Sequence, residues 1–305
     1  MKKITILFLF QILCLNAQEV TVSSGKIDQI EKFKSAFVDA RNITIWMPDG
    51  YSKDKKYAVL YMHDGQMLFD ATTTWNKQEW GVDETASKLM SNKETIDFIV
   101  VGIASISEKR HADYFPQKPF DDLSPQDKSF VTITLQEAGR TKAVFQPVSD
   151  NYLKFLVEEL KPYIDQNYAT HKDAEHTFIM GSSMGGLISL YAICEYPTIF
   201  GGAACLSTHW PGIFSVENNP IPDAFFAYMR KNLPDPKTHK IYFDFGTATL
   251  DALYPPLQKK ADEVLVEKGF IPANWETHKF EGADHSENAW KERLSIPIKF
   301  LLGAN

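Results

Sequence analysis

The sequence predicts a mixed α/β protein with a mostly parallel central sheet and helices on both of its faces. Strand-like and helix-like segments alternate through the second half of the chain, as right-handed βαβ crossovers require. Several strand-like segments are apolar throughout, which is typical of strands that are covered on both sides. With 305 residues, of which 44% are hydrophobic, the chain is long enough to bury a large core.

The predicted elements follow one another along the chain, and each has a local signal. Strand segments are rich in β-branched and aromatic residues, and are expected at 19–25, 42–50, 57–65, 96–105, 176–181, 201–207, 240–246 and 274–280. Helices have apolar residues near helical spacing, and are expected at 81–90, 151–168, 185–196, 256–270 and 287–302. Because short turns join the first strands, these strands can form an antiparallel edge of the sheet.

One connection is too long for an ordinary loop. Residues 119–149 carry no expected element, and long segments of this kind are usually functional. We therefore expect a lid or a substrate-loop insertion there, within a single catalytic domain that spans residues 18–305.

The N-terminus predicts a secretory signal peptide. Lys2 and Lys3 precede about a dozen apolar residues, and the small residue Ala17 follows them. A buried N-terminal strand or helix is the alternative, but nothing polar alternates within the run. We expect cleavage after residues 1–17 and an exported, periplasmic or secreted protein.

Charge and cysteine content exclude several classes of function. The formal net charge of −7 becomes −9 without the two N-terminal lysines, so nucleic acid and anionic membranes are not expected partners. No C-x-x-C motif or His-rich tract indicates a metal, and no cofactor is expected. Cys194 and Cys205 are expected to be buried apolar side chains, although export would permit a bridge between them.

The segment "FIMGSSMGGLISLYA" carries a candidate nucleophile. The pattern G-x-S-x-G fits only one register, with Gly181, Ser183 and Gly185. It lies between a predicted strand and a predicted helix, where a tight turn would expose the hydroxyl of Ser183. A glycine-rich turn packed closely for its own sake is the structural alternative.

A serine nucleophile needs a histidine base and an orienting carboxylate. His285 lies in the loop between the last predicted strand and the last helix, whereas His239 and His278 lie at or within strands. Asp251 is the carboxylate in the loop after 240–246, and Asp244, inside that strand, is the rival.

An oxyanion hole needs two backbone donors. Met184, the residue after the candidate nucleophile, supplies the first. Gly65 or Gln66, in the loop after the third predicted strand, is expected to supply the second.

Seven motifs in order resemble one family. They are "VLYMHDGQMLFD", "EWGVDE", "FLVEELKPYID", "GSSMGGLISLYA", "YPTIFGGAACLS", "FDFGT" and "GADHSENAW", between Ile27 and Leu302. The chain thus resembles the "Putative esterase" family of the α/β-hydrolase superfamily, which includes enterochelin-type, feruloyl and acetyl-xylan esterases. The resemblance implies the α/β-hydrolase fold, with Ser183 as nucleophile and His285 as base. It supports Asp251 less firmly, because the position of the acid varies within the family.

These features predict a serine carboxylic-ester hydrolase with an acyl-enzyme intermediate, acting on an ester-substituted carbohydrate that carries acetyl or feruloyl groups. The alternatives are a siderophore trilactone esterase and a catalytically silent ligand-binding module. A polyanionic siderophore would favour several pocket cations, of which Arg110 and Arg140 are candidates. The sequence departs from many relatives at Thr208 and His209 and at the insertion 119–149. Residues expected to contact substrate are Arg110, His209, Trp210 and Tyr254.

Overall fold

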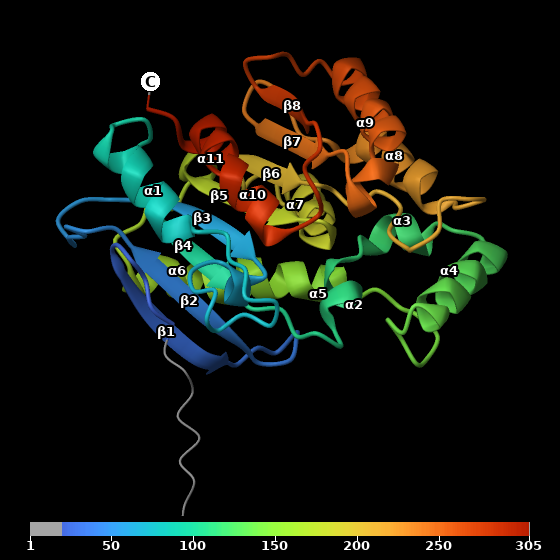
Figure 1. The fold of residues 1–305 in the computed structure, drawn as a ribbon, viewed down its shortest axis with the longest axis horizontal. Helices are drawn as coiled ribbons and strands as arrows, with labels where there is room; N and C mark the ends of the chain where they lie inside the picture. Colours follow the sequence, from blue (N-terminus) through green and yellow to red (C-terminus); the bar gives the residue numbers. More distant parts are fainter. Residues whose placement is uncertain (1–19, 305) are drawn as a thin grey trace, which may run out of the picture.

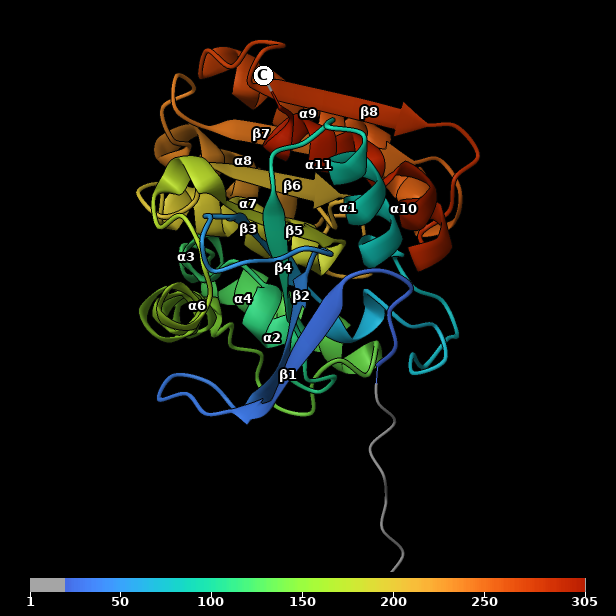
Figure 2. The ribbon, with the colours of Figure 1, turned by 90° about the vertical axis from the view of Figure 1, so that its left-hand side faces the viewer.

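The structure is a computed structural model that describes residues 20–304, so the predicted signal peptide lies outside it. Within these residues, eight strands form one twisted sheet in the order β1-β2-β4-β3-β5-β6-β7-β8, which Figure 2 shows turning from β1 at the bottom to β8 at the top. The strands are β1 (Lys26–Phe33), β2 (Arg41–Met47), β3 (Ala58–His63), β4 (Phe98–Ile103), β5 (Thr177–Ser182), β6 (Gly202–Leu206), β7 (Lys240–Gly246) and β8 (Trp275–Phe280).

Strand directions agree with the sequence. The strand β2 is antiparallel to both β1 and β4, and every other neighbouring pair is parallel. The prediction of a mostly parallel sheet with an antiparallel edge is confirmed.

The first predicted strand was wrong. Residues 20–25 form no strand, because backbone amides and hydroxyls of Thr21 and Ser23 bond to the carboxylates of Asp70 and Asp83 instead. The sheet begins at β1, an edge strand with the sequence KIDQIEKF. Because most of its side chains are exposed, β1 lacks the apolar residues by which a strand is recognised in the sequence.

Helices cover both faces of the sheet (Figure 1). One face packs against α1 (Val82–Ser91), α10 (Glu287–Arg293) and α11 (Ser295–Leu302). The other carries α2 (Arg110–Tyr114), α3 (Gln117–Asp121), α4 (Pro125–Glu137), α5 (Ser149–Lys154), α6 (Lys161–Asn167), α7 (Met184–Glu195), α8 (Ile221–Asn232) and α9 (Pro255–Glu267). Alternate residues of β3 enter the two cores. Within residues 20–304 no helix is long and apolar enough to cross a membrane.

Two predicted helices are interrupted. The helix expected at 151–168 consists of α5, a π-helical segment (Phe155–Leu160) and α6, and Pro162 lies in the first turn of α6. The helix expected at 287–302 divides into α10 and α11 around Leu294. Since Pro162 and Pro297 donate no backbone hydrogen bond, neither helix can continue its regular i→i−4 pattern through that point.

The predicted insertion is helical rather than irregular. It contains the end of α3 and all of α4, which Ser124 caps by accepting a hydrogen bond of 3.1 Å from the Asp127 amide. Phe120 and Phe145 bury their rings against Phe115, with centroids 5.7 and 5.3 Å away. The segment is thus packed against the domain, while its being an insertion and its movement as a lid both stay predictions. The helices α2 and α8 also carried no recognised sequence signal.

Both cysteines within residues 20–304 are buried free thiols. Cys194 lies at the end of α7 and Cys205 in β6. Burial raises the pKa of both thiols above the ordinary range. The expectation that they act as buried apolar side chains is confirmed.

Three buried histidines are neutral in the folded protein. Burial lowers the pKa of His63 to about 3, although the neighbouring Asp64 opposes this shift. Burial, together with Arg110, lowers the pKa of His111 to about 3. Burial also lowers the pKa of His209 well below its ordinary value.

We predict that the free energy of unfolding falls as the solution is acidified below about pH 6.5. At these pH values the three histidines bind protons in the unfolded chain but stay neutral when they are buried in the folded protein. Each buried histidine adds a slope of up to about 1.4 kcal/mol per pH unit. Urea unfolding at several pH values measures this slope. His111→Asn should reduce it relative to the wild-type protein. A free energy of unfolding with the same pH slope in both proteins would contradict the prediction.

Candidate active site

The candidate nucleophile lies in a tight turn at the carboxyl end of β5. The strand ends at Ser182 and α7 begins at Met184, so Ser183 alone connects them, with φ 59° and ψ −122°. Its amide donates to the Leu206 carbonyl (2.9 Å), and its carbonyl accepts from the His209 amide (3.1 Å). Ser183 is partly exposed, while Ser182 is buried.

The glycines on either side permit this turn. A Cβ on Gly181 would lie 2.8 Å from the carbonyl of Gly185, and one on Gly186 would lie 3.0 Å from Oγ1 of Thr208. Larger side chains would therefore separate the strand from the helix and move Ser183.

A histidine and a carboxylate meet at the ends of β7 and β8. His285 lies between β8 and α10, and Asp251 lies in a 3₁₀ turn (Thr249–Leu253) after β7. His285 Nδ1 is 2.5 Å from Asp251 Oδ1, and the His285 amide donates to Oγ1 of Thr249 at 2.9 Å. Asp251 is fully buried, whereas the His285 side chain is 15% exposed. The arrangement fixes Nδ1 of His285 against a buried carboxylate and leaves the imidazole partly exposed.

Donors hold the second oxygen of Asp251. It accepts from the Gly246 amide (2.6 Å) and from Oγ of Ser207 (2.5 Å). That Ser207 oxygen itself accepts from Trp290 Nε1 (3.0 Å) and from Arg293 (2.9 Å). Because both of these groups can only donate, the hydroxyl proton of Ser207 is directed to Asp251.

The rival carboxylate has a different partner. Asp244 lies within β7 and forms a buried ion pair of 3.0 Å with Arg293. Its other oxygen accepts from the hydroxyl of Tyr242 at 3.2 Å. The structure thus brings Asp251, and not Asp244, to His285.

The other late histidines have structural partners. His278 Nε2 lies 2.7 Å from Glu276 on the same strand, and His239 Nε2 lies 2.8 Å from the carbonyl of Pro197. This agrees with their assignment as structural residues.

The loop after β3 presents backbone amides. Asp64 has φ 54°, and a Cβ on Gly65 would lie 2.5 Å from the carbonyl carbon of Gly102, so glycine is needed there. The Gln66 side chain bonds to both the amide and the hydroxyl of Ser105, which fixes the loop. Within residues 20–304, the amides of Gly65, Gln66 and Met184 have no hydrogen-bond acceptor.

Arg110 is bound to this loop rather than free for a ligand. Its Nε and one terminal nitrogen each lie 2.7 Å from an oxygen of Asp64. Burial alone would raise the pKa of Asp64, but the Arg110 guanidinium outweighs it and the pKa is lowered. The pair therefore stays ionised and its two charges compensate each other.

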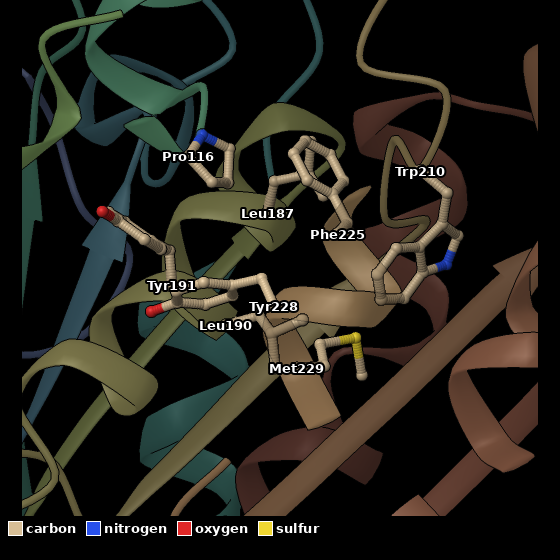
Figure 3. Close-up of a pocket in the computed structure, with 8 residues that line it drawn as sticks. All are labelled: Pro116, Leu187, Leu190, Tyr191, Trp210, Phe225, Tyr228 and Met229. Carbon is tan, nitrogen blue, oxygen red and sulfur yellow. The ribbon is translucent and has the colours of Figure 1, made fainter. Parts of the chain in front are cut away.

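Trp210 was wrongly predicted to contact substrate. Its indole is fully buried, donates to Gln258 at 2.9 Å and packs against Phe226 and Phe243. Figure 3 shows it at an apolar pocket between α7 and α8. The cavity measures about 10 Å³, which is room for about one water molecule. This pocket therefore cannot hold a substrate.

A larger cavity adjoins the turn that carries Asp251. It measures about 360 Å³ and includes Ala252 and Leu253 of that turn. Its other lining residues are Pro211, Val216, Asn219, Pro222, Pro256 and Leu257. Its lining is almost entirely apolar, and its volume is within the range of small-molecule sites.

One cluster has residue types that can ligate metals. His171, Asp173 and His176 lie before the amino end of β5, at the opposite end of that strand from Ser183. The two imidazole rings are stacked with their centroids 4.0 Å apart, and Nδ1 of His176 lies 2.6 Å from Oδ1 of Asp173. Stacked rings direct their nitrogen lone pairs side by side rather than toward one point, so we assign no metal to this cluster.

The side chains that hold the Asp251 carboxylate in place were not identified from the sequence. Ser207 could have been noticed, because it directly follows β6 at the edge of the sheet where Ser183 lies. Trp290 and Arg293 gave no signal, since they lie within a helix and reach Ser207 only through the packing of α10.

Comparison with known proteins places the chain among esterases. The family model described as "Putative esterase" matches residues 35–299, which confirms the resemblance drawn from the motifs. An endo-1,4-beta-xylanase/feruloyl esterase of Xylanibacter ruminicola is 24% identical over 285 residues, which cover 90% of this chain and 31% of that protein.

Solved esterase structures share the fold. A ferulic acid esterase superposes with a TM-score of 0.65 at 16% identity, covering 92% of this chain and 98% of the other. The enterobactin esterase of Shigella flexneri superposes with a TM-score of 0.62 at 14% identity, covering 92% and 60%.

We predict that the two aspartates affect different quantities: Asp251 the turnover number for an ester, and Asp244 the free energy of unfolding. Asp251→Asn keeps the shape but favours the wrong His285 tautomer, so kcat for an ester should fall by up to about 10⁴-fold. Asp244→Asn weakens a buried ion pair and should lower the free energy of unfolding, by about 3–5 kcal/mol if the pair is broken. Steady-state kinetics and urea unfolding of both variants separate the roles. A larger loss of kcat in the folded Asp244→Asn protein would reverse the assignment.

Proposed function

Because this chain belongs to the "Putative esterase" family and is a carboxylic ester hydrolase of the α/β-hydrolase fold, we propose that it works through Ser183, His285 and Asp251. The observation that carries this proposal is the 2.5 Å contact between His285 Nδ1 and the buried Asp251. It supports a tautomer in which Nε2 of His285 is free to accept a proton. The position of Ser183 in the turn after β5 supports its role as nucleophile.

In the proposed reaction, His285 takes the hydroxyl proton of Ser183 while Oγ attacks the ester carbonyl carbon. The backbone amides of Met184 and of Gly65 or Gln66, which bond to no acceptor in the described part of the chain, stabilise the developing oxyanion. His285 then gives its proton to the leaving alcohol, and an acyl group remains on Ser183. Water, activated by His285, hydrolyses this acyl-enzyme by the same steps in reverse order.

The proposed substrate is an ester-substituted carbohydrate with an aromatic acyl group, such as feruloyl. The apolar cavity of about 360 Å³ beside Asp251 is larger than an acetyl group needs. Separately from this cavity, the Phe214 side chain is 44% exposed, and its ring centroid lies 5.6 Å from that of His209. Both features favour a phenolic acyl group over acetyl.

A polyanionic siderophore trilactone is less well supported. The charge of Arg110 is compensated by Asp64. Arg140 forms no ion pair within the described chain, but its guanidinium stacks 5.0 Å from the ring centre of Phe214. One such cation beside an aromatic ring suits a phenolic ester better than a ligand with several negative charges.

We further propose that the enzyme is exported. The basic and apolar N-terminus, residues 1–17, supports a cleaved signal peptide and a periplasmic or secreted location. A carbohydrate ester outside the cytoplasm agrees with this location.

Ser183→Ala should abolish ester hydrolysis, with a loss of roughly 10⁶-fold in kcat, because the acyl-enzyme cannot form. Ser182→Ala is the matched control, since this buried neighbour is at the end of β5 and its loss should leave substantial activity. Chromogenic ester kinetics measure both. Wild-type turnover in Ser183→Ala would exclude this serine as nucleophile.

Substrate choice should follow the apolar cavity. We expect a higher kcat/KM on feruloylated arabinoxylan fragments than on acetylated xylan or a catecholate trilactone. Leu253→Asp places a charge in the cavity lining and should lower kcat/KM for feruloyl esters about tenfold, with acetyl esters little changed. An equal effect on both acyl groups, or preference for the trilactone, would contradict this substrate class.

A further inference from the structure

Two residues that sequence reasoning placed among the substrate contacts lie buried behind the candidate nucleophile. Tyr254 is fully buried and His209 is 2% exposed, so neither presents a surface to an incoming ligand. The His209 amide donates to the carbonyl of Ser183 at 3.1 Å, and its Nδ1 lies 2.9 Å from the Tyr254 hydroxyl. Tyr254 and Ser183 therefore converge on His209.

Tyr254 also adjoins the rest of the site. Its amide donates to the carbonyl of Asp251 at 3.0 Å, and the edge of its ring meets His285 with centroids 6.0 Å apart. Burial raises the pKa of Tyr254, while a hydrogen bond with the Ser183 side chain opposes that shift. The same short segment thus carries the partner of His285 and a hydroxyl that bonds to His209, the residue whose amide holds the Ser183 carbonyl.

We propose that Tyr254 and His209 form a second hydrogen-bonded arm on the nucleophile, in which His209 Nδ1–H donates to the Tyr254 hydroxyl and that hydroxyl donates to Oγ of Ser183. The proposal rests on the proposed serine mechanism and adds two positioning residues to it.

The direction of these bonds follows from the state of His209. Burial first, and then the nearby His111, His285, Arg110 and Arg140, keep His209 neutral. Its Nε2 is buried without a hydrogen-bond partner within the described residues. An unpaired buried N–H is rarer in proteins than an unpaired acceptor, so the proton belongs on Nδ1.

This tautomer fixes the remaining protons. With Nδ1–H of His209 pointing at the Tyr254 oxygen, the phenolic proton is free to point at Ser183. The Ser183 hydroxyl then points its own proton away from Tyr254, toward His285. As Oγ loses that proton and gains negative charge, the bond from Tyr254 becomes charge-assisted and strengthens. The arm therefore acts mainly in the transition state.

The test compares Tyr254→Phe with wild type and with Tyr228→Phe. The first change keeps the ring and removes the hydroxyl from Ser183. The second removes the hydroxyl of a partly buried tyrosine, whose partner is Glu195, outside the site. We expect kcat to fall about 10- to 100-fold in Tyr254→Phe with KM nearly unchanged, and kcat to stay near wild type in Tyr228→Phe. Equal kcat in wild type and Tyr254→Phe would overturn the proposal.

His209 supplies a second, independent test. The amide nitrogen of His209→Asn occupies the place of Nδ1 and can still donate, so this variant should recover most of the kcat that His209→Ala loses. Nitrogen NMR of the wild-type imidazoles reads the tautomer without any substrate and should place the proton on Nδ1 of His209. A proton on Nε2, or no difference between the two variants, would refute the arm. Absence of ester hydrolysis in wild type would instead contradict the proposed function, while the tautomer could still be measured.

Discussion

The rest of the site depends on one constrained residue, Ser183, at the turn between β5 and α7. Its φ of 59° is unusual for a residue with a side chain and costs about 1–3 kcal/mol. The structure tolerates this cost because Gly181, without a side chain, lets the strand approach the helix backbone at Gly185, and because neighbouring backbone groups bond to the serine. The turn lifts one hydroxyl above the sheet and leaves the adjacent amide of Met184 without an acceptor among residues 20–304.

A second constraint is the burial of two carboxylates, Asp244 within β7 and Asp251 in the turn that follows it. Each buried carboxylate needs hydrogen-bond donors, and Asp244 and Asp251 are held by one connected group of donors. Arg293 compensates Asp244 and also donates to Ser207, whose hydroxyl donates a hydrogen bond to Asp251. The charge of Asp251 is therefore held by neutral donors, and its remaining oxygen is free to orient His285.

The sequence predicted the parts that depend on local patterns. Apolar strands and the G-x-S-x-G turn located the sheet and Ser183, and the order of loops located His285 and Asp251. The errors arise where the position of a segment in the folded protein, rather than a local sequence pattern, decides its structure. The exposed edge strand β1 lacks apolar residues, and side-chain contacts from Asp70 and Asp83 replace a strand at 20–25. Whether Trp210 faces solvent or core depends on how α8 packs, which no local pattern records.

The most direct test of the central claim is mass spectrometry of the protein after reaction with a serine-directed phosphonate or a slowly hydrolysed ester. Peptide mapping should find the phosphonyl or acyl group on Ser183 and nowhere else, and the Asp251→Asn protein should be labelled far more slowly. A covalent group on another residue, or steady ester turnover with Ser183 unlabelled throughout, would contradict the account.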